Sequence, residues 1–204
     1  MKQKKRVRGR QYLIWKRGMD ILFSTVLLIF LWIPMGVIAL AVGMTSKGGI
    51  LFRQVRVGRN GEPFVCYKFR TMVSWAPRNC PTSELGDPTP FVTPVGQFLR
   101  RSSLDELPQL WNVLRGDMSL VGPRPLIPKE AEIHELRRRC GVYAIRPGMT
   151  GLAQVSGRDL LCDREKLRLD ARYLRRLSFG EDARILWKTI FHVFQGEGIV
   201  GGGG

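Results

Sequence analysis

The sequence predicts a mixed α/β, helix-rich fold with a short β-hairpin, preceded by an N-terminal helical segment that associates with a membrane. Three observations support this fold class. Ile21–Ser46 runs for 26 residues without a charged side chain, an Asn-Gly turn separates two β-type runs, and helical spacing of apolar residues recurs behind them. We expect three regions: a basic N-terminus and anchor at 1–47, a folded domain at 48–200, and a low-complexity glycine tail at 201–204.

The uncharged stretch is long enough to interact with a whole bilayer. As a straight helix it would reach about 39 Å, against a hydrocarbon core of about 30 Å. Met1–Arg17 carries eight basic residues and no acidic one, and Lys47 and further arginines follow on the other side. Because basic flanks favour the cytoplasm, both ends are expected on one face, with a re-entrant break at Ile33-Pro34. A single spanning helix remains the alternative.

The segment behind the anchor is predicted to be a hairpin. Ile50–Val55 and Phe64–Phe69 are rich in β-branched and aromatic residues, and Gly58–Gly61 between them contains Asn-Gly. The following stretch, Ser74–Pro94, is rich in Pro, Ser and Thr and is expected to be a loop.

The rest of the chain is predicted to be mostly helical. Helices are expected at Ser102–Leu114, Pro128–Arg139, Glu165–Leu177 and Asp182–Phe194. Arg146–Gly151 is expected to be irregular because Pro and Gly interrupt helices and strands. The last helix mixes Trp and other apolar residues with cations, so it either lies in a membrane interface or packs onto the core.

Composition restricts the classes of partner. The net charge of +16 and the pI near 10.6 indicate an anionic partner. With an apolar anchor present, anionic lipid explains the N-terminal charge, and no nucleic-acid-binding motif is recognisable, so no nucleic acid partner is expected. The four cysteines form no CxxC pair and are expected to be free thiols in a reducing compartment.

Asp105 and Glu106 are the candidate reactive carboxylates. One interpretation is structural, because Ser103 and Glu106 have the spacing of a capping box. The other is catalytic: Asp105 acts as a nucleophile on phosphorus or, with Glu106, as a ligand of Mg²⁺, which would neutralise phosphate charge. The spacing leaves both interpretations open.

Phosphate chemistry also needs cations in fixed positions. Arg124 lies between two prolines that restrict its backbone, and a guanidinium can bind phosphate oxygens with two hydrogen bonds. Arg100 precedes the acidic pair, Lys68 ends the second predicted strand, and Arg146 precedes Pro-Gly. Each alone fits a solvated surface charge, but together they indicate a phosphate site.

The order of these motifs resembles that of one family. The motifs are Lys16-Arg17-x-x-Asp20 before a proline-interrupted apolar segment, Tyr67–Met72, Arg100–Val113, Gly116–Pro125 and Arg146–Arg158. Together they resemble the bacterial sugar transferases, the monotopic phosphoglycosyl transferases, over nearly the whole chain. The chain looks like the minimal catalytic unit of that family.

The resemblance implies a reaction and roles for individual residues. A sugar 1-phosphate would pass from a UDP-sugar to polyprenyl (undecaprenyl) phosphate, releasing UMP and starting a surface glycan. Asp105 would form a covalent phosphosugar intermediate, with Mg²⁺ as cofactor. Glu106 and Lys68 would complete the catalytic group. Phosphate and substrate binding would fall to Arg100, Arg124, Arg146, Asp170 and Tyr173.

The resemblance also implies a re-entrant anchor at the bacterial inner membrane, with the catalytic domain on the cytoplasmic face. The sequence departs from the family pattern at the break, where Ile33 replaces the usual serine, so a spanning helix stays open. Two other functions are compatible with the residues. One is a Mg²⁺-dependent, membrane-associated hydrolase of UDP-sugars or lipid diphosphates, and the other is a non-enzymatic protein that binds nucleic acid or anionic lipid through its basic surface.

Overall fold

The computed structural model describes residues 2–77, 89–157 and 160–195, with only the backbone described for residues 2–10, 194 and 195. The predicted glycine tail at 201–204 lies outside these ranges, as does most of the expected loop Ser74–Pro94. The helices are α1 (Lys2–Thr45), α2 (Pro94–Arg101), α3 (Gln109–Arg115), α4 (Ala131–Arg139), α5 (Asp163–Arg175) and α6 (Phe179–Gln195). The strands are β1 (Leu51–Val57), β2 (Pro63–Phe69), β3 (Ser119–Val121) and β4 (Gly148–Thr150).

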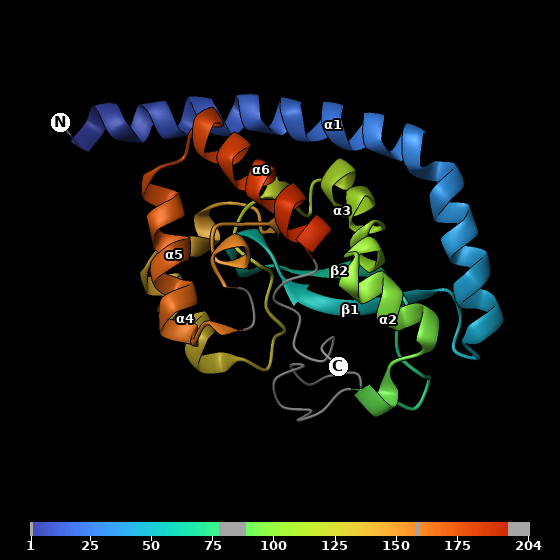
Figure 1. The fold of residues 1–204 in the computed structure, drawn as a ribbon. Coiled ribbons are helices and arrows are strands. Elements are labelled where there is room, and N and C mark those ends of the chain that lie inside the picture. Colours follow the sequence, from blue (N-terminus) through green and yellow to red (C-terminus); the bar gives the residue numbers. More distant parts are fainter. Residues whose placement is uncertain (1, 78–88, 158–159, 196–204) are drawn as a thin grey trace.

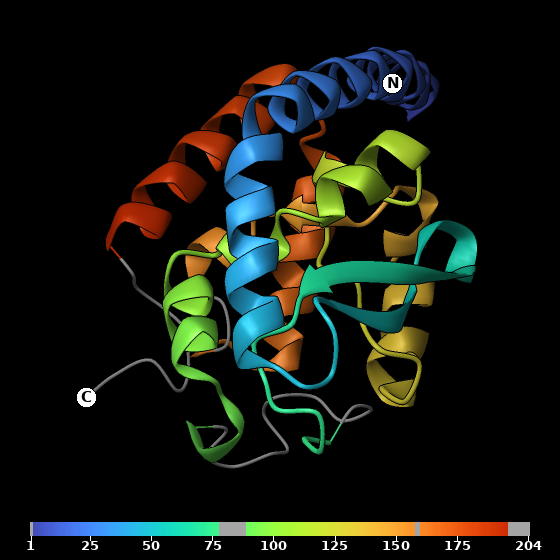
Figure 2. The same ribbon diagram turned by 90° about the vertical axis from the view of Figure 1, so that its right-hand side faces the viewer.

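The N-terminal helix α1 is long, bent and apolar on its outer side. It runs along one side of the domain and then bends, so that its C-terminal arm descends along an adjacent side (Figures 1 and 2). Helical structure continues through Ile33 and Pro34, so the predicted break takes the form of a bend in an unbroken helix. Side chains on its outer side, such as Phe30 and Trp32, are exposed, and only 6 % of the most apolar part of the helix is buried. By length and composition this helix could cross a membrane.

The predicted hairpin is confirmed. β1 and β2 pair antiparallel, with Arg56 opposite Phe64 and Phe52 opposite Lys68. The turn between them depends on left-handed backbone at Asn60 (φ 59°) and Gly61 (φ 83°), which an Asn-Gly pair adopts more readily than other residues.

The predicted helix Ser102–Leu114 is wrong in its first half. The chain instead forms α2, then a left-handed residue at Ser103 (φ 56°), a short 3₁₀ turn at Leu104–Glu106, here called η4, and finally α3. Pro108 has no N–H and clashes with the preceding turn, so one continuous helix cannot pass through it. The sequence analysis also missed α2, although Thr93 caps it by accepting a hydrogen bond from Gly96 N (3.0 Å) and Pro94 opens it.

The expectation that Arg146–Gly151 is irregular is also wrong. Gly148–Thr150 forms β4, which pairs parallel with β3. The two backbones approach so closely that a Cβ on Gly148 would lie 2.0 Å from Gly122 N. Glycine therefore permits this short strand instead of interrupting it.

Among the described residues, three apolar clusters hold the domain together. One joins β3, α5 and α6 through Val121, Tyr173 and Ile185, and a second joins β2 to α3. In the third, Val42 of α1 packs with Phe69 and Leu99. The helices α4, α5 and α6 correspond to the predicted helical stretches, and α6 begins against the first arm of α1 (Figure 1).

Candidate active site

Asp105 lies in η4, between α2 and α3, and is only 9 % exposed. Its flanking residues Leu104 and Leu107 pack against the apolar cluster that contains Val42 of α1. The C-terminal arm of α1 therefore supports the short turn that presents the carboxyl group. Asp105 is thus held at a fixed position relative to the outer face of α1.

Lys68, Glu106 and Arg124 surround this carboxyl group. Lys68 Nζ donates to Glu106 Oε1 at 2.5 Å and lies 4.0 Å from Asp105 Oδ2. Arg124 Nη1 lies 3.9 Å from the same Glu106 oxygen. The capping box predicted for Ser103 and Glu106 is wrong, because Ser103 makes no side-chain cap and the Glu106 carboxylate binds Lys68.

The environment makes Asp105 an unusually basic carboxylate. Burial raises its pKa from 3.8 to about 6, and the negative charge of Glu106 acts in the same direction. The nearby cations Lys68, Arg100 and Arg124 limit the rise of the pKa. At pH 7 the group is therefore ionised but poorly solvated, which suits a carboxylate nucleophile.

An open cavity beside this cluster carries excess positive charge. Arg56, Lys68 and Arg124 line it, with Glu106 as the one carboxylate in its wall. Arg56 is held by a hydrogen bond from Nη1 to Pro125 O (3.0 Å). Burial is the main cause of the lowered pKa of its guanidinium. Such a wall can bind an anion with more than one negative charge.

Sequence analysis overlooked Arg56, although a signal was present. Paired residues of an antiparallel hairpin lie on the same face, and residues two apart in one strand share that face. The register pairs Arg56 with Phe64 and Phe52 with Lys68. The turn position would therefore have placed Arg56 on the face of Lys68.

Asp170 was predicted to bind substrate phosphate, and the structure contradicts a direct contact. It is 2 % exposed and accepts from Arg137 Nη2 at 2.6 Å. Arg137 Nη1 also donates to the backbone oxygen of Arg124 at 2.7 Å. Asp170 therefore orients Arg137, which in turn holds the backbone of Arg124.

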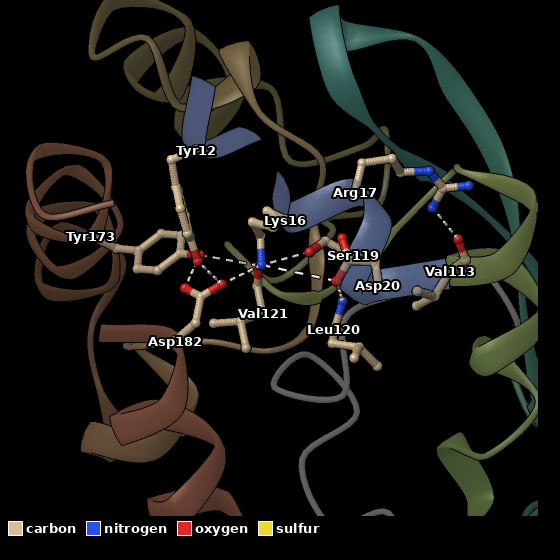
Figure 3. Close-up of polar contacts among 10 residues, drawn as sticks. All are labelled: Tyr12, Lys16, Arg17, Asp20, Val113, Ser119, Leu120, Val121, Tyr173 and Asp182. Carbon is tan, nitrogen blue, oxygen red and sulfur yellow. Dashed lines mark hydrogen bonds and ion pairs between the residues drawn. The ribbon is translucent and has the colours of Figure 1, made fainter. Parts of the chain in front are cut away.

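Tyr173 was also predicted to bind substrate, and its position contradicts this as well. Its side chain is 1 % exposed, and its hydroxyl donates to Asp182 Oδ1 (2.6 Å). Figure 3 shows the same carboxylate accepting from Tyr12 (2.7 Å) and Lys16 (2.5 Å) of α1. Tyr173 thus belongs to a buried network that joins α1 to α5 and α6.

The Lys-Arg-x-x-Asp motif attaches α1 to the domain. Besides the Lys16 contact, Arg17 Nη1 donates to Val113 O at 2.6 Å and Asp20 Oδ1 accepts from Leu120 N at 3.0 Å (Figure 3). These contacts reach α3 and β3. They fix the angle of the first arm of α1 against the domain.

Arg100 and Arg146, which were predicted to bind phosphate, lie in different surroundings. Arg100 Nη2 contacts Met72 Sδ at 3.8 Å, and its charge lowers the pKa of Asp105. Arg146 Nε instead donates to Gly116 O (2.7 Å), and its side chain lines a second cavity. That second cavity shares no lining residue with the first one.

The donor set fits a magnesium ion that arrives with a phosphorylated ligand. In the described part of the chain, no three His, Cys, Asp or Glu side chains gather as a metal cluster. Asp105 and Glu106 are adjacent carboxylates, and Mg²⁺ is commonly bound by one or two carboxylates together with substrate phosphates.

Comparison with known proteins places these features in a family. A family model described as "Bacterial sugar transferase" matches residues 11–196. A "UDP-galactose-lipid carrier transferase" from Erwinia amylovora is 39 % identical over 90 % of this chain and 41 % of its own length. A "UDP-glucose:undecaprenyl-phosphate glucose-1-phosphate transferase" from Klebsiella pneumoniae is 40 % identical over 89 % of this chain and 40 % of its own length. The "Exopolysaccharide production protein ExoY" of Sinorhizobium fredii (strain NBRC 101917 / NGR234) is 37 % identical over 87 % of this chain and 84 % of its own length. The chain thus spans about two fifths of the first two relatives and most of the third.

Proposed function

This chain belongs to the bacterial sugar transferase family, and we propose that it moves a sugar 1-phosphate from a UDP-sugar to undecaprenyl phosphate, releasing UMP. The observation that carries the proposal is the position of Asp105: a buried carboxyl group with a pKa of about 6, beside Glu106 and among Lys68, Arg100 and Arg124. The product would be the first lipid-linked intermediate of a surface glycan.

The proposed reaction has two displacements at one phosphorus atom. In the first, the Asp105 carboxylate attacks the phosphorus that carries the sugar, a new P–O bond forms, and the diphosphate P–O bond breaks. UMP leaves with the electron pair of that bond. In the second, a phosphate oxygen of the lipid attacks the same phosphorus and the Asp105 carboxylate is released. Two such steps produce ping-pong kinetics.

The surrounding residues would stabilise the charge that develops during these steps. Arg124 and Arg56 line the cavity and would bind the diphosphate oxygens of the donor. Lys68 donates a hydrogen bond to Glu106, and its ammonium group lies 4.0 Å from Asp105 Oδ2, where its positive charge would stabilise a phosphate group under attack. When bound at Asp105 and Glu106, Mg²⁺ would neutralise part of the phosphate charge.

The outer apolar surface supports placement of this site at a membrane surface. Trp187 (63 % exposed), Ile190 (50 %) and Phe191 (47 %) of α6 are exposed, while Ile185 of the same helix is buried in the core. We propose that α6 lies in the interface and that α1 enters and leaves one leaflet, with the domain on the cytoplasmic face of the inner membrane. The acceptor phosphate would then meet Asp105 at the level of the head groups.

A trapping experiment tests the chemistry. The protein is incubated with UDP-sugar and Mg²⁺ but without lipid, and its intact mass is measured. We expect one added phosphosugar on the wild type and on the control Asp163→Asn, and none on Asp105→Asn. UMP release by Asp105→Asn at the wild-type rate would contradict the proposal. Continued turnover of donor without lipid would support a hydrolase instead.

A labelling experiment tests the topology. Cys80, Cys140 and Cys162 are replaced by serine, and single cysteines are introduced as Gln3→Cys and Glu62→Cys. In sealed vesicles, an impermeant thiol reagent should label both positions from the same side. Labelling from opposite sides would show that α1 spans the bilayer.

A further inference from the structure

A second positively charged cavity lies between the first arm of α1 and the domain, apart from the Asp105 cluster. Its charged lining residues are Lys16, Arg17 and Asp20 from α1, Arg59 from the hairpin turn, and Arg146 from the segment before β4. These residues come from three separate parts of the chain. Neither the proposed reaction nor the proposed donor site uses this cavity.

Positive charge exceeds negative charge in this cavity. Lys16 is neutralised by Asp182, at 2.5 Å, and Asp20 Oδ1 lies 4.0 Å from Lys16. Among the described residues, Arg17, Arg59 and Arg146 form no ion pair with a carboxylate. In the described part of the chain, three guanidinium groups therefore share one cavity with a single carboxylate, Asp20, which forms no ion pair with any of them.

Backbone carbonyls hold two of these arginines in place. Arg17 donates to Val113 O (2.6 Å) and Leu114 O (2.8 Å), and Arg146 Nε donates to Gly116 O (2.7 Å). These contacts are explained by capping of the C-terminus of α3. However, capping uses only Nε of Arg146, and in the described ranges neither of its Nη groups has a protein partner. Helix capping also does not explain why Arg59 lies in this cavity, because its side chain has no polar contact in the described part of the chain.

Arg17 and Arg59 lie near enough to Arg146 for their positive charges to repel its own, and Asp20 offsets only part of this repulsion. Burial lowers the pKa of Arg146, and the charges of Arg17 and then Arg59 lower it further. Bringing like charges together costs free energy, and a bound anion would remove that cost. A phosphate group suits the site because guanidinium groups bind its oxygens with paired, charge-assisted hydrogen bonds.

The position of the cavity indicates where the phosphate would come from. Leu13 lines the cavity, and the next two residues along α1, Ile14 (70 % exposed) and Trp15 (76 %), face outward. Tryptophan beside cationic residues is typical of the head-group level of a bilayer. We propose that Arg17, Arg59 and Arg146 bind the phosphate of an anionic membrane lipid and so fasten the first arm of α1 at that level. The lipid source rests on the proposed membrane placement.

Thermal unfolding in a zwitterionic detergent tests this site directly. Short-chain phosphatidylglycerol, short-chain phosphatidylcholine and inorganic phosphate are titrated separately, and Tm is followed. Phosphatidylglycerol should raise Tm of the wild type, while phosphatidylcholine and equimolar inorganic phosphate should not. An equal rise with inorganic phosphate would overturn the lipid assignment, and an equal rise with phosphatidylcholine would overturn the site.

Matched variants separate this site from general electrostatics. Arg59→Gln and Arg146→Gln should each weaken the apparent affinity for phosphatidylglycerol about tenfold, which is the loss of about 1.4 kcal/mol of charge-assisted hydrogen bonding. Arg164→Gln, which removes the same charge from an exposed position on α5, should leave the affinity unchanged. Equal weakening by all three would overturn the proposal. Asp105→Asn should keep the response to the lipid, so that failure of the transferase mechanism is distinguished from failure of this site.

Discussion

Lys68 Nζ donates to Glu106 Oε1 across 2.5 Å, which joins the end of β2 to the turn that carries the candidate nucleophile. The same nitrogen lies 4.0 Å from Asp105 Oδ2. The lysine therefore lowers the pKa of Asp105 by its charge, without a hydrogen bond to that carboxyl group. Lys68 lowers the pKa of Asp105 and Glu106 raises it, so replacing one or the other should shift this pKa in opposite directions.

The first prediction concerns the pH profile. In the proposed mechanism Asp105 attacks as an ionised carboxylate. Because its pKa is about 6, kcat/KM of the wild type should fall below that pH, by about tenfold per pH unit. Lys68→Met removes the cation that lowers this pKa and should move the acid limb to higher pH. Glu106→Gln removes the anion that raises it and should move the limb to lower pH. Shifts in the same direction would contradict this electrostatic account.

The second prediction concerns stability. Folding raises the pKa of Asp105 from 3.8 to about 6, so between these values the folded state binds the proton more tightly than the unfolded state does. The stabilisation that this difference provides is complete below pH 3.8 and is lost as the pH rises to about 6. Asp105→Asn should therefore stabilise the protein at pH 7.5, by roughly 1–3 kcal/mol, while abolishing activity. Urea unfolding of both proteins at pH 4 and 7.5 measures this, and a gain that does not grow with pH would refute it.

The third prediction concerns the residues behind Arg124. Asp170→Asn leaves the buried Arg137 without its carboxylate and should destabilise the protein by about 3–5 kcal/mol. The surface pair of Asp163 and Lys166 offers a control, because Asp163→Asn should cost no more than about 1 kcal/mol. Surviving Asp170→Asn protein should also show a higher KM for the UDP-sugar, since Arg137 supports the backbone of Arg124. An unchanged KM would show that Asp170 has no influence on binding of the UDP-sugar.

The fourth prediction concerns the close approach of β3 and β4. A Cβ at position 148 would meet backbone at 2.0 Å, so Gly148→Ala should destabilise the protein by several kcal/mol and distort the cavity wall that Gly148 forms. Gly180→Ala in the first turn of α6 meets nothing within 4 Å and should be neutral or slightly stabilising. Chemical denaturation of both variants provides the comparison. Equal stabilities would mean that the two strands can separate without cost.

Near neighbours in the chain determined the features that were predicted correctly. The hairpin follows from Asn60-Gly61 between two β-type runs, and α4, α5 and α6 follow from their own spacing of apolar and charged residues. The break predicted at Ile33-Pro34 is not seen, because α1 continues through both residues, and the re-entrant course of this helix stays a prediction. The order of the motifs indicated the family, and comparison with known proteins confirmed it. The predicted helix Ser102–Leu114 was wrong before Pro108, because a proline lacks an N–H and clashes with the preceding turn, so that the helix can only begin after it.

Contacts between distant parts of the chain decided the rest, because burial and pairing depend on what packs opposite each residue. Tertiary structure paired β3 with β4, turning a predicted irregular segment into a strand. It buried Asp170 and Tyr173, which had been assigned to substrate, in ion pairs and hydrogen bonds that support other residues. By itself, the sequence determined which side chains carry carboxylate and guanidinium groups, and so which residues are predicted to take part in phosphate transfer. Only the fold decided that Arg56 lines the cavity beside Asp105 and that Arg146 lines another.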